Sequence, residues 1–265
     1  MLRITQIREW PHQLAFFTSG QSNRPQTNHL PFYRATVEGL SPEDGAVVLI
    51  SDLQGREQAS GNRLLGEVVA EELELFQSVG ELDRIRLIVI AGDLYDYPDL
   101  RKRGGTGPVD SVWHACAKLA PVVGVMGNHD ELDAPDALPD DVRILDGSVV
   151  EIAGLRIGGV SGIIGDPKRN HRKSDQAFGR ALQRAIEGYP HLLILHQGPD
   201  DPTSGQRGDG ATRASLENRY RGLTVFGHRH WDDPFVITLA NGQAINVDGR
   251  VVICEGPGQT AISSS

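Results

Sequence analysis

The sequence has little cysteine and no long apolar run, and these absences exclude several classes of protein. Only two cysteines, Cys116 and Cys254, occur in 265 residues, without a Cys-x-x-Cys spacing. A disulfide framework or a zinc finger is therefore not expected, and a cytoplasmic location is favoured. No apolar run approaches the roughly 20 residues that a membrane span requires, so no membrane contact is expected. The first residues also lack the apolar core of a signal peptide.

An excess of basic residues is missing as well. The chain has 26 Lys and Arg against 35 Asp and Glu, and a formal net charge of −9. This balance disfavours extended nucleic acid as a partner. A small phosphoester or a nucleotide remains compatible with it, because bound cations reverse the local electric field. The oligomeric state is not indicated by the sequence.

Motifs for phosphate cradling and for covalent catalysis are also absent. The glycines of residues 158–165 match neither a P-loop nor a Rossmann fingerprint, so we expect them at turns and close-packed positions. No nucleophile elbow surrounds Ser161 or Ser204. Cys116 lies in an apparent helix and Cys254 in an apparent strand, where both are expected as core residues.

What the sequence does contain is a set of short apolar runs that end in potential metal ligands. Continuous apolar runs are typical of strands buried on both faces of a parallel sheet. The runs are residues 46–51, 87–91, 122–126, 192–195 and 223–226. After them come Asp52, Gly92-Asp93, Gly127-Asn128-His129, His196 and Gly227-His228-Arg229-His230. Because ligands bind beyond the carboxyl ends of such strands, these oxygen and nitrogen donors predict a site for two divalent ions.

The first two motifs supply oxygen donors. Asp52 and Gln54 are two residues apart at a strand end, so both can face one ion. Alone, Asp-x-Gln is common, and the alternative is a turn residue beside a solvated amide. Asp93 can bridge two ions through its two carboxylate oxygens. Asp96 follows about one helical turn later, with a helix N-cap as the alternative.

The Gly-Asn-His-Asp motif is the most specific local signal. Asn128 offers a carbonyl oxygen to an ion and an amide group to a phosphate oxygen. His129 points elsewhere and can serve as an acid toward a leaving group. Asp96 or Asp130 is expected to hydrogen-bond His129 and orient it. Taken alone, the motif also fits a loop asparagine with an exposed histidine.

The histidines of the last two motifs are expected to complete the site. A single histidine at a strand end, such as His196, is more often structural than metal-bound. His228 and His230 form a compact chelate, and Gly227 leaves room for it. The order of the five motifs, each after an apolar run, favours a metal centre over coincidence.

The remaining pattern indicates an α/β domain at residues 46–265. Helices are expected at residues 62–79, 109–119 and 174–188, hairpins around 153–154 and 241–242, and a last strand at 251–256. Two facing sheets covered by helices fit this order. Residues 1–45 are harder to interpret, with short strands expected at 2–7 and 14–18 and a loop at 19–31. They form either an edge hairpin or a covering arm.

Three loops are expected to discriminate between substrates: residues 98–109, 166–174 and 198–215. Their basic side chains could contact an anionic substrate, but a solvated loop surface is the expectation for most of them. These side chains are Arg101, Lys102, Arg103, Lys168, Arg169, Arg172 and Lys173.

The ordered motifs over about residues 47–230 resemble the calcineurin-like metallophosphoesterase superfamily. The resemblance implies a four-layered α/β/β/α sandwich of two mixed sheets flanked by helices, around a dinuclear metal centre. It implies one ion held by Asp52, Gln54, Asp93 and His230, and another held by Asp93, Asn128, His196 and His228. Asn128 and His129 would contact the substrate, His129 would protonate or stabilise the leaving oxygen, and Asp96 would support His129.

Gln54 departs from the pattern of this superfamily, which has a histidine at that position. An amide oxygen is a harder and weaker donor than imidazole, so Mn²⁺ is expected, with Fe, Zn, Ni and Mg as alternatives. The expected activity is hydrolysis of a small phosphodiester or phosphomonoester by a metal-activated water. The alternative is a catalytically impaired scaffold that acts in protein interaction. A single-metal hydrolase of another class, such as an amidohydrolase, is disfavoured because it would not need Asn128 and His129.

Overall fold

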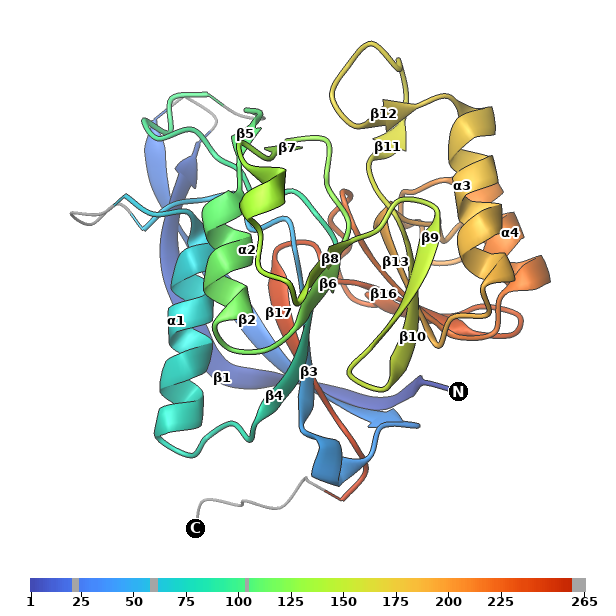
Figure 1. The fold of residues 1–265 in the computed structure, drawn as a ribbon, viewed down its shortest axis with the longest axis horizontal. Coiled ribbons are helices and arrows are strands. Elements are labelled where there is room, and N and C mark those ends of the chain that lie inside the picture. Colours follow the sequence, from blue (N-terminus) through green and yellow to red (C-terminus); the bar gives the residue numbers. More distant parts are fainter. Residues whose placement is uncertain (21–23, 58–61, 103–104, 259–265) are drawn as a thin grey trace.

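The protein is described here from a computed structural model that covers residues 1–20, 24–57, 62–102 and 105–258. Two mixed β-sheets lie face to face, with helices on both outer sides (Figure 1). The first sheet has the order β1 (Arg3–Ser19), β2 (Pro25–Glu38), β17 (Arg250–Glu255), β3 (Ala46–Ser51), β4 (Ile85–Ile90), β6 (Val122–Gly124) and β8 (Val142–Ile144). The second has the order β15 (Val236–Thr238), β16 (Gln243–Asn246), β14 (Leu223–Gly227), β13 (Leu192–Gln197), β10 (Leu155–Val160) and β9 (Ser148–Ile152).

The helices form the two outer layers. Helices α1 (Leu65–Ser78) and α2 (Asp110–Ala117) cover the first sheet, and α3 (Asp175–Glu187) and α4 (Gly210–Arg219) cover the second (Figure 1). Shorter elements are β5 (Gly107–Pro108), β7 (Asp130–Glu131), β11 (Ile163–Ile164), β12 (Arg172–Lys173) and the 3₁₀ turns Pro42–Asp44 and Pro135–Ala137. The α/β/β/α sandwich expected from the sequence is confirmed. Among the described residues, no helix has both the length and the apolar character that crossing a membrane demands.

Strand β3 shows why the apolar runs are continuous. Val47 and Leu49 belong to the core between the two sheets. Val48 and Ile50 point the other way, into the core beneath α1 and α2. Since side chains alternate between the faces of a strand, a strand covered on both faces must be apolar throughout.

Strands β1 and β2 form one long antiparallel pair at the edge of the first sheet. Strand β1 pairs with β2 along its length, and β2 pairs in parallel with β17. The expected loop at residues 19–31 is therefore wrong in part, because Pro25 onward already belongs to β2. This stretch is polar and has no strand-like alternation. Its extended conformation comes from the ladder with β1 rather than from local propensity.

Helix α4 also begins where a loop was expected, inside residues 198–215, and continues to Arg219. The Asp209 side chain caps it by accepting a hydrogen bond from the Thr212 backbone N–H at 2.7 Å. Cys116 and Cys254 are buried and unpaired, one in α2 and the other in β17, as the sequence predicts.

Candidate metal centre

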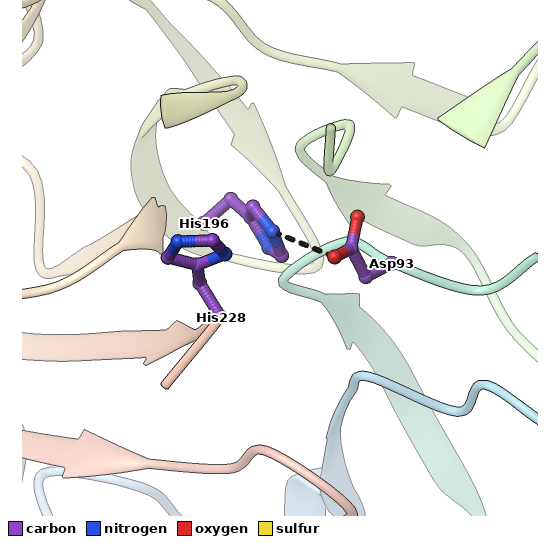
Figure 2. A group of neighbouring side chains, drawn as sticks. All are labelled: Asp93, His196 and His228. Atoms are coloured by element: carbon purple, nitrogen blue, oxygen red, sulfur yellow. Dashed lines mark ion pairs between the residues drawn. The ribbon is translucent and has the colours of Figure 1, made fainter. Parts of the chain in front are cut away.

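Three side chains meet where β4, β13 and β14 end. Asp93, His196 and His228 each offer a ligand atom, and these atoms all lie within 4.8 Å of one another. Figure 2 shows the two imidazoles and the carboxylate facing a common point. His196 Nε2 lies 3.2 Å from Asp93 Oδ2. This compact set of one carboxylate and two imidazoles is suited to a divalent transition metal.

Hydrogen bonds to Nδ1 orient two of the predicted histidine ligands. His196 Nδ1 lies 2.7 Å from the Ala91 carbonyl oxygen, and His230 Nδ1 lies 3.1 Å from Asp248 Oδ1. Because a carbonyl oxygen only accepts, Nδ1 of His196 carries the proton and Nε2 is left for an ion. Metal-binding histidines usually have such a partner on the other ring nitrogen.

The backbone at the strand ends is held in an uncommon conformation. Asp52, Asp93 and His228 have positive φ values of 52°, 55° and 68°. Such values are rare for residues other than glycine, and they tend to occur at functional sites. Neighbouring glycines allow this close approach. A Cβ at Gly127 would collide with the Asp93 carboxylate, and one at Gly227 with the Asp52 carboxylate.

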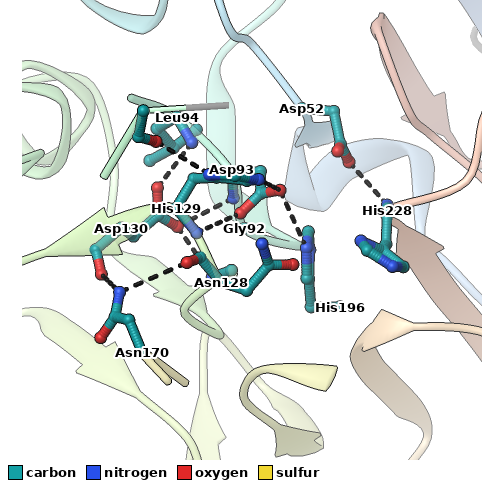
Figure 3. A network of polar contacts seen from close by, with 12 residues as sticks. Asp52, Gly92, Asp93, Leu94, Asn128, His129, Asp130, Asn170, His196 and His228 are labelled. Atoms are coloured by element: carbon teal, nitrogen blue, oxygen red, sulfur yellow. Dashed lines mark hydrogen bonds and ion pairs between the residues drawn. The ribbon is translucent and has the colours of Figure 1, made fainter. Parts of the chain in front are cut away.

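Several buried polar atoms lack a hydrogen-bond partner within the described part of the chain, and one of them is Oδ1 of Asn128 in the predicted site. His196 Nε2, also buried, has only the Asp93 carboxylate at 3.2 Å beside it. Figure 3 shows the side chains of Asn128 and His196 next to Asp93. An unsatisfied buried polar atom costs about 1–3 kcal/mol, so such atoms need an explanation. Coordination of a metal ion would satisfy Asn128 Oδ1, and the residues present therefore fit a metal centre.

Asp93 and His228 line a cleft with a volume of about 890 Å³. The predicted ligands Asp52, Gln54 and His230 line it as well. Asp52 Oδ2 accepts hydrogen bonds from the His228 backbone N–H at 2.9 Å and from Ser51 Oγ at 2.6 Å. Gln54 and His230 also line the cleft, and His230 does not belong to the cluster of three. Their roles as ligands remain predictions.

His129 also lines the cleft, but its hydrogen-bond partner differs from the expectation. Its Nδ1 lies 2.8 Å from the Gly105 carbonyl oxygen, so Nδ1 donates and Nε2 is the nitrogen free to exchange a proton. Nε2 is 3.9 Å from Asp93 Oδ2. Among the described residues no hydrogen bond joins His129 to Asp96. The Asp96 carboxylate instead accepts from the Tyr97 N–H at 2.8 Å.

The expected contact between Asp130 and His129 is wrong. The Asp130 carboxylate accepts hydrogen bonds from three backbone N–H groups, those of Asp93 at 2.8 Å, Leu94 at 2.7 Å and Gly127 at 2.8 Å. It thereby joins the loops that carry two of the predicted ligands, Asp93 and Asn128 (Figure 3). Asp130 is fully buried, and burial together with the Asp93 charge raises its pKa to about 6.

The basic loop residues are not part of the cleft lining. Of those at residues 98–109 and 166–174, every described one lies outside it, and Arg103 falls outside the described residues. Lys173, for example, donates to the Ser161 carbonyl at 2.6 Å and pairs with Asp146 at 3.2 Å. Loop 166–174 contributes through Asn170, which donates to the Asp130 carbonyl at 2.9 Å.

The electrostatics of the cluster follow from burial and mutual charge. Burial raises the pKa of Asp93, but the adjacent His196 outweighs this effect and lowers the pKa to about 2. Burial lowers the pKa of His196, and the Asp93 charge outweighs it and raises the pKa to about 10. Burial and the charge of His196 lower the pKa of His228 to about 3. Without an ion, His196 therefore carries a proton that a metal must displace, while His228 is already neutral.

We therefore expect metal binding to release protons. At pH 8, below the pKa of about 10 for His196, addition of Mn²⁺ to the metal-free protein should release at least one proton from the cluster. Titration calorimetry in buffers of different ionisation enthalpy measures this release. Stoichiometric Mn²⁺ binding with no proton release would show that the ion does not displace a proton from His196.

Asp248 is a residue of the site that sequence reasoning missed. It hydrogen-bonds the Nδ1 of His230, and its charge adds to burial in raising the pKa of the Asp52 carboxyl. The sequence signal was weak, because Asn246 interrupts the apolar residues that precede Asp248.

Together, the sandwich and its edge site define a metal-binding α/β/β/α protein. Residues 45–232 match the sequence model of the calcineurin-like phosphoesterases, and the chain belongs to this family. Membership assigns it to the metal-dependent phosphoester hydrolases in general. No curated protein is significantly similar to the chain in sequence.

The chain was compared with solved structures, and the first of those named here supports the fold. TT1561 of Thermus thermophilus superposes with a TM-score of 0.53 at 14% identity, over 77% of this chain and 90% of TT1561. A hypothetical protein of the same organism gives a TM-score of 0.47 at 16% identity, over 76% of this chain and 75% of its own. Phosphopantetheinyl hydrolase from Mycobacterium tuberculosis gives 0.41 at 14% identity, over 85% and 100%.

Proposed function

We propose that the protein hydrolyses a small phosphoester with two divalent ions bound at the edge site. The observation that supports this proposal is the cluster of Asp93, His196 and His228, whose ligand atoms lie within 4.8 Å of one another, beside the unpartnered Oδ1 of Asn128. One ion would be held by Asp52, Gln54, Asp93 and His230, and the other by Asp93, Asn128, His196 and His228. Bound there, two ions would neutralise phosphate oxygens and lower the pKa of a water molecule.

The residues of the chain position the substrate and move the proton. The Asn128 amide group is available to donate to a phosphate oxygen while its Oδ1 serves as a ligand. His129 donates to Gly105 through Nδ1, which leaves Nε2 to deliver a proton to the leaving oxygen. Asp96 borders the same cleft, and we assign it an electrostatic role toward His129 rather than a direct hydrogen bond.

Gln54 favours a hard ion at the first position. Its amide oxygen is a weaker donor than imidazole, so we propose Mn²⁺, with Fe, Zn, Ni and Mg as the other candidates. A cytoplasmic location is part of the proposal and rests on the two unpaired thiols.

Dependence on metal tests the proposal directly. After a chelator has removed the metal, the purified protein should hydrolyse p-nitrophenyl phosphate or bis-p-nitrophenyl phosphate at least about 100-fold more slowly, because the proposed mechanism relies on metal to activate the water. Adding Mn²⁺ should restore it, and plasma mass spectrometry should find about two ions per chain. A protein that binds no metal and hydrolyses neither ester with Mn²⁺ present would instead support the interaction scaffold.

A further inference from the structure

The β1–β2 hairpin extends beyond the edge of the first sheet at which the site lies. Strand β2 pairs with β17 only from Phe32 onward, and Arg250 of β17 lies opposite Ser51, next to Asp52. Residues 25–31 and their partners at 13–19 therefore project past this edge, and we call them the overhang. At the rise of a strand, the overhang is about 20 Å long. In Figure 1 the hairpin, in dark blue, runs from the bottom of the molecule to its upper left.

Backbone and side-chain contacts fix the overhang to the loops of the site. Phe17 and Arg56 exchange backbone hydrogen bonds of 2.9 and 2.8 Å. Thr18 Oγ1 donates to Asp96 Oδ2 at 3.3 Å. Phe16 packs so closely on Gly55, the residue after Gln54, that a Cβ there would collide with its ring. The overhang is thus attached to the loop that carries a predicted metal ligand.

The overhang lines the cleft, and so do residues of loop 228–235. Gln26, Asn28 and His29 of the overhang are exposed and belong to this lining. Tyr33 and Phe235 also line the cleft and meet edge to face at 5.0 Å between ring centroids. At about 890 Å³ the cleft is as large as those that enclose whole drug-sized ligands, far more than a phosphate group needs.

The chemistry of the walls selects the kind of group that fits. The overhang offers neutral amides and an imidazole, and the aromatic rings of Tyr33 and Phe235 line the same cleft. Amide side chains recognise base edges, and aromatic rings stack on planar groups. Outside the predicted ligands, the carboxylates of Asp96, Asp232, Asp233 and Asp248 line the cleft and outnumber its two arginines, Arg229 and Arg250. The excess negative charge of this lining disfavours a second phosphate.

We propose that the overhang is a substrate-selecting wall that binds the planar, uncharged, hydrogen-bonding arm of a phosphodiester, as a nucleoside would provide. The matched family region starts at residue 45, so this wall is supplied by a segment outside it. The inference rests on the proposed function, since the ester bond must lie at the metal centre.

Two diesters with the same leaving group and the same charge test the wall. These are the p-nitrophenyl ester of thymidine monophosphate and methyl p-nitrophenyl phosphate, with p-nitrophenyl phosphate as a reporter of the metal chemistry. The wild-type protein with Mn²⁺ should prefer the thymidine diester by at least about tenfold in kcat/KM, the value of one or two hydrogen bonds. The double variant Asn28→Ala/His29→Ala should lose this preference. Thr27→Ala, exposed on the same strand but outside the cleft lining, should keep it.

The outcomes separate this inference from the proposed function. Hydrolysis of none of the three esters would contradict the proposed function. Hydrolysis of the monoester alone would overturn the inference about the overhang, because the site would then not accept a phosphate that carries a second ester group. Equal rates for both diesters, or a preference that survives in the double variant, would also overturn it.

Discussion

Asp93→Asn should lower kcat/KM for phosphoester hydrolysis by at least about 1,000-fold, beyond the 10–100-fold loss typical of a partner outside the ligand shell. The substitution keeps the shape of the side chain and removes its charge. Both carboxylate oxygens of Asp93 contact other site residues. Oδ2 lies 3.2 Å from His196 Nε2, and Oδ1 accepts a hydrogen bond from the His129 N–H at 2.9 Å. A neutral amide there cannot bridge two cations, so metal content should fall together with the rate.

Kinetics and metal analysis on the same preparations test this prediction, and circular dichroism checks that the variant is folded. Asp136→Asn is the matched control, because Asp136 is an exposed aspartate of a 3₁₀ turn outside the cleft. It should retain wild-type rates and metal content. Near-normal turnover in Asp93→Asn, in a preparation free of contaminating phosphatase, would disprove the assignment of Asp93 as the bridging ligand.

Asp130→Ala should destabilise the protein by about 3–5 kcal/mol and remove metal binding as well. The carboxylate is fully buried and accepts the N–H groups of Asp93, Leu94 and Gly127. Without it, these donors are left unsatisfied and the two ligand-bearing loops separate. For a chain of this size the loss corresponds to a fall in Tm of about 10 °C.

Thermal unfolding of the metal-free protein measures this effect without interference from the ions. Asp130→Asn should be intermediate, because its remaining oxygen can still accept the N–H groups of Asp93 and Gly127, which share Oδ2 in the wild type, while the Leu94 N–H loses its acceptor. Asp136→Ala should leave the Tm unchanged. An Asp130→Ala protein with a wild-type Tm and full metal content would show that the two loops hold their positions without the carboxylate.

The sequence predicted the strands of the two sheets well, because burial on both faces forces a continuous apolar run, as in β3. It did not predict residues 25–31 of β2, whose strand conformation depends on pairing with β1 rather than on their own polar side chains. Helix α4 escaped for a related reason. Of its side chains only Thr212 and Leu216 are buried, so it has almost no apolar stripe to detect.

For the site, the sequence predicted residue identities better than contacts. Asp93, His196 and His228 converge as expected, because each follows a strand whose end the sheet topology places at one edge. The partner of His129 could not be predicted, since it is a backbone carbonyl at Gly105 and any residue type supplies one. The sequence indicated that Asp130 supports the site but not through which contacts, because its three N–H donors come from backbone segments that meet only in the folded chain.

The most direct test of a two-metal centre on Asp93 is anomalous X-ray diffraction from crystals of the protein soaked in Mn²⁺. The account predicts two strong peaks about 3.5–4 Å apart, with the Asp93 carboxylate between them and Asn128, His196 and His228 around one of them. A single ion at Asp93, or peaks away from these side chains, would contradict it.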